Sequence, residues 1–425
     1  GWGRYPKVDA QVDEPAFVED ISRSLKSNTV LARGMARSYG DASLNDHVVS
    51  TLNCNRIIDF NTDSGELECE AGATLDLIID LILPKGFFLP VTPGTKFVTV
   101  GGAIAADIHG KNHHIDGCFG KHVVFLDLLI EDGSVLRCSP EEYPDRFYKT
   151  IGGMGLSGVI VKARFRLKRV STAYINQKVI KCRNLDEIMS AFENNQDSTY
   201  SVAWLDTSQT GKGIGKSVLL LGEHANESDL TGSKKNPLEL PKKKSVSLPF
   251  NFPAFTINPL TIKVFNVLFY LKNRNTEKAI IDLDSYFYPL DAIHNWNRIY
   301  GKPGFTQYQF VIPMERSREG LQEILAFIAE NKRLSFLTVL KMFGKADEKA
   351  KLSFPKEGYT LTIDLNVNKG IEEFIAGLDD LVEKYDGRVY FAKDAFSRLG
   401  RKDITRFNLK ENRTFNSRLA DRLTS

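Results

Sequence analysis

The chain has 425 residues, enough for two or three domains or for one large bipartite enzyme. Hydrophobic residues make up 42% of it, an ordinary share for a globular protein, and the formal net charge is only +3. Acidic and basic residues are interspersed, so no electrostatic footprint for nucleic acid is present, and we expect no nucleic-acid partner.

The cysteines are scattered, odd in number and never spaced as CxxC, which argues against both a disulfide framework and a zinc cluster. They are Cys54, Cys69, Cys118, Cys138 and Cys182. We expect reduced thiols in a cytoplasmic-type compartment, with a periplasmic location not excluded. No apolar run approaches the roughly 20 residues that span a bilayer. We therefore expect a soluble protein, at most peripheral to a membrane.

The first 170 residues are rich in glycine and in short strand-like runs. A helix is predicted over PAFVEDISRSLKS (15–27). Strands are predicted within NTVLARG (28–34), HVVSTLN (47–53), GELECEAGA (65–73), HVVFLDLLIEDGSVL (122–136) and GLSGVIVKARFRLKRV (155–170). Short strands separated by glycine turns are typical of an α+β domain.

After Ser171 the pattern changes to longer β-prone segments mixed with helices, among them NLDEIMSAFENN (184–195) and REGLQEILAFIAENK (318–332). This pattern predicts a second sheet with helices on one face and a domain boundary near residue 173. Between about Asn226 and Pro259, lysine, proline, serine and asparagine accumulate and hydrophobic periodicity disappears. We expect a long loop there, either flexible or a lid.

Three glycine clusters need a chemical explanation: RGMARSYGD (33–41), PGTKFVTVGGAIAADIHG (93–110) and IGGMGLSGVI (151–160). Each puts glycines at a strand end or turn, where backbone N–H groups can approach a pyrophosphate without a Cβ in the way. None matches GxGxxG in a βαβ unit or GxxxxGK[ST], so neither a Rossmann site nor a P-loop is predicted. Each cluster alone is compatible with a structural turn, but three in one domain favour a ligand site.

The stretch GKNHH (110–114) and the preceding His109 contain three of the seven histidines, beside a run of small or apolar residues. Metal binding, catalysis and packing are all conceivable roles for them. Metal binding is disfavoured because the adjacent His113 and His114 point in different directions on most backbones. We expect no metal, and a packed or surface role for His113 and His114.

Further motifs run along the chain: GWGR (1–4), SVAWLD (201–206), PLDAIHNWNRIYG (289–301), FTQYQFVIP (305–313), LKMFG (340–344) and VYFAKD (389–394). Together with the glycine clusters they resemble the decaprenylphosphoryl-β-D-ribose 2-oxidase family, flavoenzymes with the PCMH-type FAD-binding fold of the vanillyl-alcohol oxidase superfamily. The resemblance implies a two-domain α+β protein. Residues 1–173 would bind FAD, residues 174–387 would form a substrate domain on an antiparallel sheet flanked by helices, and residues 388–425 would return to the FAD domain.

The resemblance also implies an activity, the FAD-dependent oxidation of the 2-hydroxyl of a polyprenyl-phosphate-linked ribofuranose to the 2-keto sugar. That step would be the first half of an epimerisation to the arabinose form for cell-envelope arabinan synthesis. An NADH-dependent short-chain reductase would be the partner that completes it, and peripheral contact with a membrane is compatible with such a substrate. Two alternatives remain, an FAD-dependent oxidase of a free sugar, alditol or aldonolactone, and a non-enzymatic flavoprotein or binding module.

Carried onto this sequence, the family's FAD contacts fall in the three clusters and in VYFAKD. They are Arg33, Gly34, Met35, Ala36, Arg37, Ser38, Tyr39, Pro93, Gly94, Thr95, Thr99, Gly101, Gly102, Ala106, Ile108, His109, Gly110, Gly155, Gly158, Ile160, Tyr390 and Lys393. Many covalent members of the superfamily attach FAD through a histidine in the first cluster, where this chain has Ser38 and Tyr39. We therefore expect non-covalent FAD, and for Cys118 we expect an ordinary buried or surface thiol.

The resemblance assigns catalysis to His109, Gln309, Lys341 and Lys393. It places Lys111, Trp204, Gln307, Gln309, Lys341, Phe343 and Thr362 at the substrate, with Tyr39 and Trp296 as further apolar walls. Gln307 and Gln309 alternate by two, so on a strand they face the same side, although an exposed polar face would give the same spacing. Lys393 would stabilise negative charge on the flavin pyrimidine, and a solvated lysine at a strand end is the alternative.

One position departs from the mycobacterial members of the family. In the strand that resembles GYTLTIDLN (358–366) they carry a cysteine that nitroaromatic inhibitors trap covalently, whereas this chain has Thr362. A hydroxyl is a far weaker nucleophile than a thiolate at neutral pH, so the adduct should not form here. Alcohol oxidation by a flavin needs no protein nucleophile, so turnover need not suffer.

Overall fold

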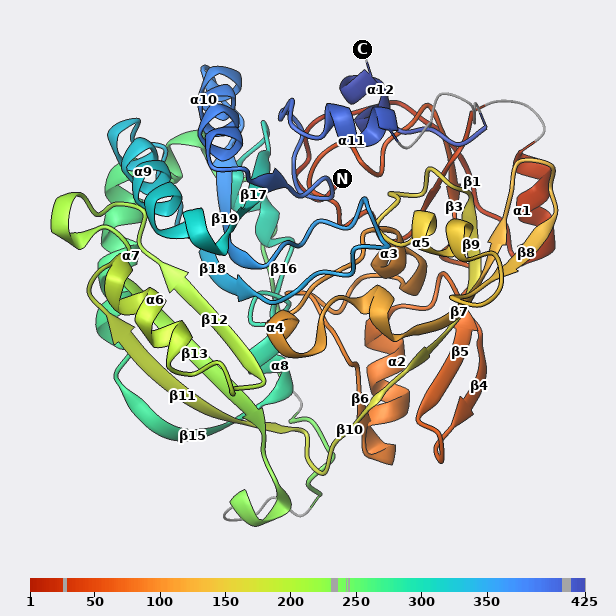
Figure 1. Ribbon diagram of the computed structural model, residues 1–425, viewed down its shortest axis with the longest axis horizontal. Coiled ribbons are helices and arrows are strands. Elements are labelled where there is room, and N and C mark those ends of the chain that lie inside the picture. The colour runs from red at the N-terminus through yellow and green to blue at the C-terminus, as the bar shows by residue number, and fades with distance from the viewer. Residues whose placement is uncertain (26–28, 231–235, 242, 244, 407–413, 425) are drawn as a thin grey trace.

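The computed structural model describes residues 1–25, 29–230, 236–241, 243, 245–406 and 414–424. The chain folds into two parts that lie side by side, each built around its own antiparallel sheet with helices packed on it (Figure 1). This arrangement confirms the predicted two-domain α+β fold.

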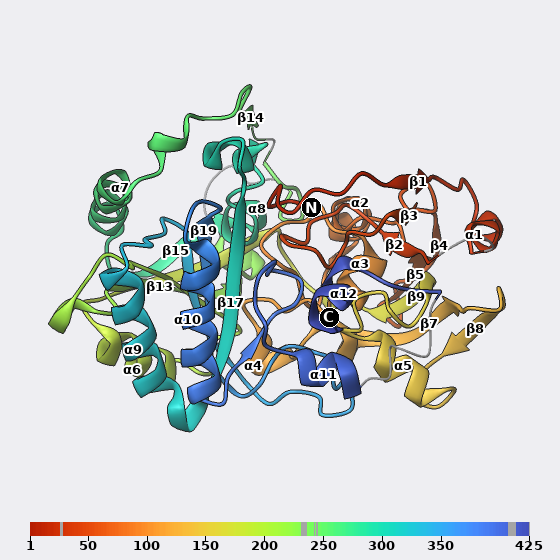
Figure 2. The same ribbon diagram turned by 90° about the horizontal axis from the view of Figure 1, so that it is seen from above.

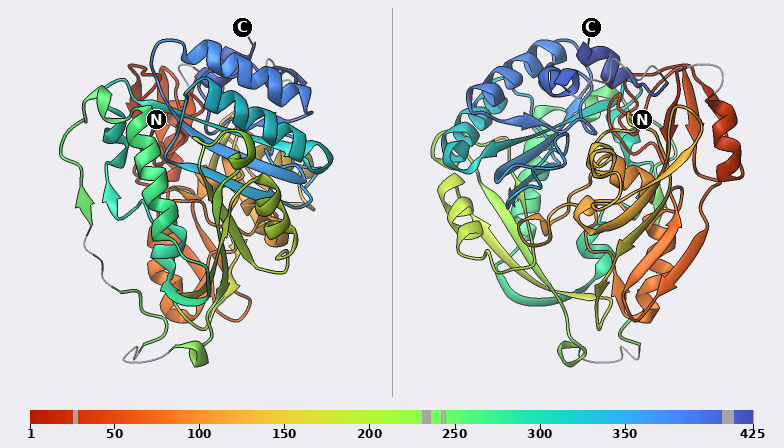
Figure 3. Two further views of the ribbon diagram at one scale, coloured as in Figure 1. Left: turned by 90° about the vertical axis from the view of Figure 1, so that its left-hand side faces the viewer. Right: turned by 45° about the vertical axis from the view of Figure 1, so that its right-hand side comes forward.

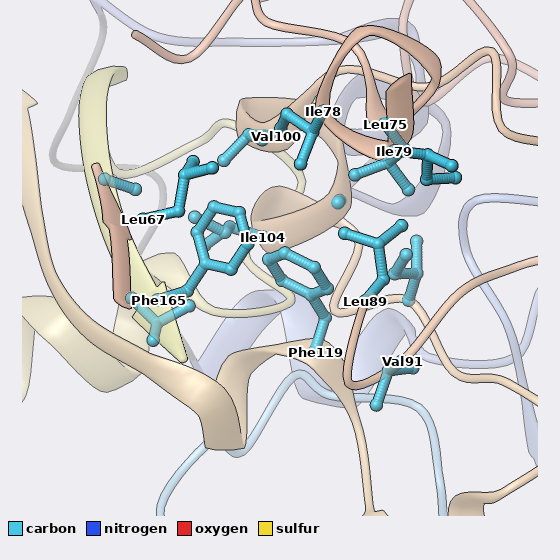
Figure 4. Packing of buried hydrophobic residues seen from close by; sticks show 14 of the residues in the cluster. Leu67, Leu75, Ile78, Ile79, Leu89, Val91, Val100, Ile104, Phe119 and Phe165 are labelled. Atoms are coloured by element: carbon cyan, nitrogen blue, oxygen red, sulfur yellow. The ribbon is translucent and has the colours of Figure 1, made fainter. Parts of the chain in front are cut away.

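The first part contains a five-stranded antiparallel sheet in the order β4-β5-β9-β7-β8. Its strands are β4 (Ile57–Asn61), β5 (Glu66–Glu70), β7 (Val123–Leu129), β8 (Val135–Cys138) and β9 (Val159–Arg166). Helices α2 (Leu75–Ile82) and α3 (Val100–Ala105) pack on it. Four residues of α2, Leu75, Ile78, Ile79 and Ile82, recur at helical spacing and are fully buried. They meet Leu67 and Phe165 of the sheet and Ile104 of α3 in one core (Figure 4).

Beside this sheet lies a small parallel sheet of β1 (Gln11–Asp13), β3 (His47–Ser50) and β2 (Leu31–Arg33), with α1 (Val18–Ser24) between β1 and β2 in the chain. The strand β2 ends where the first glycine cluster begins. The run 122–136 forms two strands, β7 and β8, because the chain turns at Gly133, whose φ is +85°. Shorter elements of this part are α4 (His113–Asp116), α5 (Pro144–Thr150) and the paired strands β6 (Phe87–Phe88) and β10 (Lys168–Arg169).

The second part is an eight-stranded sheet in the order β15-β11-β13-β12-β18-β19-β17-β20, antiparallel throughout. Its strands are β11 (Tyr174–Cys182), β12 (Tyr200–Leu205), β13 (Ser217–His224), β15 (Thr276–Asp282), β17 (Phe305–Pro313), β18 (Thr338–Phe343), β19 (Gly358–Asn366) and β20 (Arg388–Val389). Helices α6 (Leu185–Glu193), α9 (Ser317–Glu330) and α10 (Ile371–Lys384) cover one face (Figure 2). The predicted helices at 184–195 and 318–332 are thereby confirmed.

The lysine- and proline-rich stretch lies partly outside the described residues, at 231–235, 242 and 244. Its described parts include β14 (Val246–Ser247), which pairs with β16 (Ile293–His294), so they are not wholly irregular. A lid role for this stretch stays a prediction. The helix α7 (Pro259–Lys272) follows directly, and the sequence did not predict it. None of the described helices is long and apolar enough to cross a membrane.

Two segments connect the parts. Helix α8 (Leu283–Phe287) follows β15 of the eight-stranded sheet but buries Tyr286 and Phe287 in the core of the first part. The C-terminal segment, with α11 (Arg401–Arg406) and α12 (Arg418–Thr424), lies on the first part, where Arg422 forms an ion pair with Asp41 at 2.6 Å. These contacts support a C-terminal return to the first part, but the division at residues 173 and 388 stays a prediction.

Candidate active site

The three glycine clusters, far apart in sequence, meet around α3. A Cβ on Gly34 of the first cluster would lie 2.1 Å from Oγ1 of Thr99, the residue that caps α3. The N–H groups of Gly152 and Met154 in the third cluster donate to the carbonyls of Ile104 and Ala105 in α3, at 3.0 and 2.9 Å. The start and the end of one short helix therefore hold the other two clusters in place.

The first cluster presents backbone donors that the protein itself does not use. In the part of the chain that the structure describes, the N–H groups of residues 35–38 donate to no protein acceptor. Ala36 has a φ of +50°, a left-handed conformation that turns successive N–H groups toward a common point. In the second cluster, a Cβ on Gly94 would meet nothing within 4 Å. Unpaired donors beside open space fit the diphosphate of a dinucleotide.

The segment that follows β20 closes this site from the other side. The Tyr390 hydroxyl donates to the carbonyl of Ala106 at 2.8 Å, and the Tyr39 N–H donates to the carbonyl of Ala392 at 3.0 Å. These bonds bring Lys393, with its Nζ 4.2 Å from the centre of the Tyr39 ring, to the first cluster. The structure thus brings Tyr390 and Lys393 of VYFAKD to the first two glycine clusters, whereas Ile160 of the third packs in the core of the first part.

One face of the eight-stranded sheet is polar where it meets these loops. Register pairs Gln307 with Asp364, Gln309 with Thr362, and Lys341 with Thr360, so all six side chains project from the same face. The opposite face carries α6, α9 and α10. The prediction that Gln307 and Gln309 share a face is confirmed.

His109 lies at the junction of the loops and this polar face. Its ring is buried, with Nε2 at 3.0 Å from Gln309 Nε2 and Nδ1 at 3.1 Å from Lys341 Nζ. The ring also packs edge-on against Phe343, with 4.8 Å between centroids. Burial lowers the pKa of His109 well below its usual value, so the imidazole is neutral.

A chain of hydrogen bonds fixes which His109 nitrogen carries the hydrogen. The Thr360 hydroxyl donates to the Phe310 carbonyl at 2.8 Å, so it can only accept from Gln309 Nε2, which lies 3.2 Å away. With the Gln309 amide thus oriented, its second hydrogen points to His109 Nε2, which must accept. The hydrogen of the neutral ring is then on Nδ1 and is donated to Lys341, which requires the lysine to be an uncharged amine.

Burial lowers the pKa of two lysines at the site, Lys341 and Lys393. Burial and the proximity of Lys393 lower the pKa of Lys341 to about 7, which agrees with an uncharged amine in part of the molecules at neutral pH. Burial lowers the pKa of Lys393 only to about 8, because the nearby Asp364 carboxylate favours its charged form. Burial raises the pKa of Asp364 to about 6, although Tyr300 donates to it at 2.9 Å.

Some predicted substrate residues lie apart from His109. Lys111 Nζ donates to the carbonyls of Tyr286 at 2.6 Å and Phe287 at 3.3 Å, and burial lowers its pKa to about 7. Trp204 projects from the polar face two strands along, but its indole N–H donates to the Phe336 carbonyl at 3.1 Å and its ring packs on Phe269 of α7. Their roles at the substrate stay predictions.

The remaining histidines, cysteines and aromatic residues of the region are packed. His113 lies against Phe343 at 4.3 Å between centroids, and His114 Nε2 is 2.8 Å from the Ser198 carbonyl oxygen. Trp296 is buried with Tyr300 and Phe305 beside Tyr39. Cys118 is buried, and burial raises the pKa of its thiol well above the usual value, so it is no nucleophile at neutral pH. Over the described residues, no three His, Cys, Asp or Glu side chains are grouped as a metal site would need.

Sequence reasoning missed four residues of this site. Thr360 and Asp364 flank Thr362 at two-residue spacing in GYTLTIDLN, so strand alternation could have found them. Tyr300, which donates to Asp364, lay within a family motif but had no assigned role. Phe354, stacked on Tyr390 with 4.8 Å between centroids, comes from an irregular segment with no periodicity to reveal it.

Comparison with known proteins agrees with this geometry. Residues 6–139 match a family model described as an FAD binding domain. The chain is 36% identical over 407 residues to decaprenylphosphoryl-β-D-ribose oxidase of Mycolicibacterium smegmatis, an alignment that covers 93% of this chain and 88% of that protein. The chain belongs to the decaprenylphosphoryl-β-D-ribose oxidase family. It is an FAD-dependent oxidoreductase that acts on a CH–OH group, which confirms the predicted family, cofactor and reaction class.

Other relatives are more distant or partial. An uncharacterised protein in the mprA 5′ region of Streptomyces coelicolor is 30% identical over 338 residues, which cover 76% of this chain and 89% of that protein. D-arabinono-1,4-lactone oxidase of Yarrowia lipolytica is 25% identical over 183 residues, which cover 40% of this chain and 34% of the relative. The likeness to the lactone oxidase therefore leaves more than half of this chain unmatched.

Proposed function

We propose that this chain oxidises the 2-hydroxyl of a polyprenyl-phosphate-linked ribofuranose to the 2-keto sugar. The observation that carries the proposal is the meeting of two surfaces, the junction of the glycine clusters and the polar face of the eight-stranded sheet, at His109. The relative of 36% identity is a decaprenylphosphoryl-β-D-ribose oxidase over most of its length, which supports this substrate class.

When bound, FAD supplies the acceptor for a hydride from the carbinol carbon. The chain must supply a group that takes the hydroxyl proton, and we propose Lys341 for this role. Its pKa of about 7 lies near the working pH, where a general base is most effective. A neutral amine has one lone pair, so Lys341 would release the His109 Nδ1–H as it takes the substrate proton, and until then His109 positions the base.

Charge and hydrogen bonds around the sugar come from neighbouring residues in this proposal. Lys393, mostly charged at neutral pH, would stabilise the negative charge that arises on the cofactor during reduction. Gln307 donates to Asp364, and their remaining polar groups face the same space as Thr362. Amide and carboxylate groups on one rigid sheet are suited to hold several sugar hydroxyls in a fixed orientation.

Two partners follow from the chemistry. The 2-keto product must be reduced on its other face to complete an epimerisation, and we propose an NADH-dependent short-chain reductase for that step. A polyprenyl carrier resides in a membrane, so we also propose peripheral membrane contact of a protein that works in the cytoplasm. Neither partner is needed for the oxidation itself, so the oxidation can be tested alone.

The test is anaerobic reduction of the bound flavin, followed by the loss of its visible absorbance. A polyprenyl-phosphate ribose should bleach the flavin, whereas free ribose, alditols and aldonolactones at equal concentration should not. Bleaching by a free sugar or lactone alone would favour the second candidate, a sugar or lactone oxidase, which the partial likeness to the Yarrowia enzyme supports. No bleaching by any compound would point to a non-enzymatic flavoprotein.

We further propose that FAD is held without a covalent bond, because the first cluster has Ser38 and Tyr39 where covalent relatives have histidine. The one cysteine beside the site, Cys118, is buried and protonated. Acid precipitation should therefore release all yellow colour into the supernatant. Colour that remains in the washed pellet would show a covalent link.

A further inference from the structure

Helix α7 is the most apolar exposed element of the described structure. Its outward positions 260, 264, 267, 268 and 271 repeat at helical spacing and are all leucine or valine. Leu260, Leu268 and Leu271 are 71%, 61% and 64% exposed. This is the stripe that normally faces a core, yet here its side chains are exposed. The helix itself lies at the surface of the molecule (Figure 3, left).

Only a narrow side of α7 attaches it to the body. Ile262 and Asn266 are its buried residues, and Asn266 donates to Asp206 at 2.7 Å. Phe269 packs on Trp204 of β12, with 4.5 Å between ring centroids. The helix is thus anchored by a buried polar contact and by aromatic contacts with the body. These contacts fix the orientation of α7, so the same apolar side chains stay exposed.

Apolar exposure extends from α7 into the segment before it. Phe250 and Phe255 are 62% and 78% exposed, and Val246 of β14 is 62% exposed. More than half of the large hydrophobic residues exposed in the described structure lie between residues 246 and 271. Such a concentration marks an interaction surface rather than the scattered exposed leucines of an ordinary protein surface.

The charge around this surface has one sign. Residues 249–276 contain no aspartate or glutamate, while Lys263, Lys272 and Arg274 are all exposed. Among the described residues, none of these three basic side chains forms an ion pair. Apolar side chains flanked by unpaired basic ones complement the boundary between acyl chains and anionic headgroups of a phospholipid bilayer.

We propose that α7, with Phe250 and Phe255, docks the protein on the surface of an anionic phospholipid membrane. The inference deepens the proposed function and rests on it, since a polyprenyl-linked sugar has to be drawn from a bilayer. The outward leucines would enter the headgroup boundary while Lys263 and Lys272 remain at the phosphate level.

The docking surface is connected to the site by packed aromatic rings. Phe265 of α7 contacts Phe336, with 5.6 Å between centroids, and Phe336 stacks on Tyr300 at 5.8 Å. The Tyr300 hydroxyl in turn donates to Asp364 on the polar face. Three packed side chains, Phe265, Phe336 and Tyr300, therefore link a membrane bound at α7 to the sugar-binding face.

The test is flotation of the FAD-loaded full chain with lipid vesicles. Wild type should float with vesicles that contain phosphatidylglycerol, bind phosphatidylcholine vesicles more weakly, and lose binding as salt rises. The variant Leu268→Asp/Leu271→Asp should bind about a hundredfold more weakly, because each leucine removed from the boundary costs roughly tenfold. Leu77→Asp is the matched control, an exposed leucine on α2, and should bind like wild type.

The outcomes separate this inference from the proposed function. A short-chain, water-soluble prenyl-phosphate ribose should reduce the flavin of the double variant at the wild-type rate, whereas long-chain substrate in vesicles should reduce it more slowly. Absence of vesicle binding by wild type, or equal binding by both leucine variants, would overturn the docking surface even if the soluble substrate reacts. A wild-type dimer that the double variant breaks in sedimentation velocity, without vesicle binding, would assign the surface to a second copy instead.

Discussion

The two faces of strands β17 and β19 carry opposite kinds of side chain, apolar on one face and polar on the other. On one face Tyr308, Phe310, Leu361 and Ile363 are fully buried under helices. On the other, one residue along, Gln307, Gln309, Thr360, Thr362 and Asp364 line the site. Because side chains alternate along a strand, the same nine-residue segments supply both the rigid support and the chemistry.

The polar face is also buried, so its polar groups, unlike the side chains of the apolar face, need hydrogen-bond partners within the protein. A buried polar group without a partner lowers the free energy of unfolding, that is, it destabilises the folded protein. Gln307 is paired with Asp364, and Gln309 with Thr360 and His109. Substitutions on the polar face should therefore mainly reduce activity, whereas substitutions on the apolar face should mainly reduce stability.

The largest loss of activity should come from removing the charge of Lys393, which lies at the polar face. Lys393→Ala should lower the rate of flavin reduction by about 10²- to 10³-fold, because an oriented charge beside the developing negative charge is lost. FAD retention should weaken while circular dichroism shows an intact fold. Lys384→Ala, a lysine on the outer surface of α10, is the control and should react like wild type. A Lys393→Ala variant with full FAD content and the wild-type rate would make Lys393 an ordinary structural lysine.

The apolar face should show the opposite result. Leu361→Ala removes a fully buried side chain beneath α9 and α10, and should lower the free energy of unfolding by about 2–5 kcal/mol. Denaturant unfolding gives this value, and flavin reduction below the transition should stay within a few-fold of wild type. Thr362→Val, the neighbouring position on the polar face, is the companion and should change stability much less. Equal loss of stability in both variants would contradict the division between the faces.

The sequence predicted the alternation but not what each face contacts. Spacing alone placed Gln307 and Gln309 on one side, and the family motifs marked His109, Lys341 and Lys393 as neighbours, which the structure brings together. The links between them are long-range: His109 and Gln309 are 200 residues apart, and no local pattern predicts that they meet. Local periodicity can reveal a face, whereas the partner of that face depends on the tertiary fold.

The same limit explains what was missed at α7. Its apolar spacing is typical of a helix that packs on a core, so sequence alone would have placed its leucines inside. The structure shows instead that Ile262 and Asn266 make the inward side. Which side of an apolar helix faces outward depends on the packing of Trp204 beneath it, which is not encoded in the helix itself.

A smaller effect should appear in the pH dependence of the polar face. Asp364 raises the pKa of Lys393, which burial otherwise lowers, and the result is about 8. Flavin reduction that depends on the Lys393 charge should therefore fall as pH rises through about 8. In Asp364→Asn the carboxylate charge is lost, so the Lys393 pKa should drop and the fall should occur about one unit lower. An unchanged alkaline limb, in a variant with normal FAD content, would show that Asp364 does not act on Lys393.

The smallest change in turnover should come from Thr362, although it gives the most local test of the polar face. Its side chain shares that face with Gln309 and Lys341, and it is almost fully buried. Wild type should resist covalent inactivation by a nitroaromatic compound, because a hydroxyl at this position is too weak a nucleophile. The variant Thr362→Cys should oxidise its substrate within a few-fold of wild type.

The same variant should, however, become sensitive to the nitroaromatic compound. Reduction of the nitro group in the active site produces an electrophile, and a thiol on this face is positioned to capture it before it diffuses away. Mass spectrometry after turnover should find an adduct on residue 362 of the variant and none on wild type. The buried Cys118, present in both proteins, is an internal control that should stay unmodified because burial keeps its thiol protonated. An active, FAD-loaded variant without an adduct would remove this part of β19 from the catalytic space, whichever sugar is the substrate.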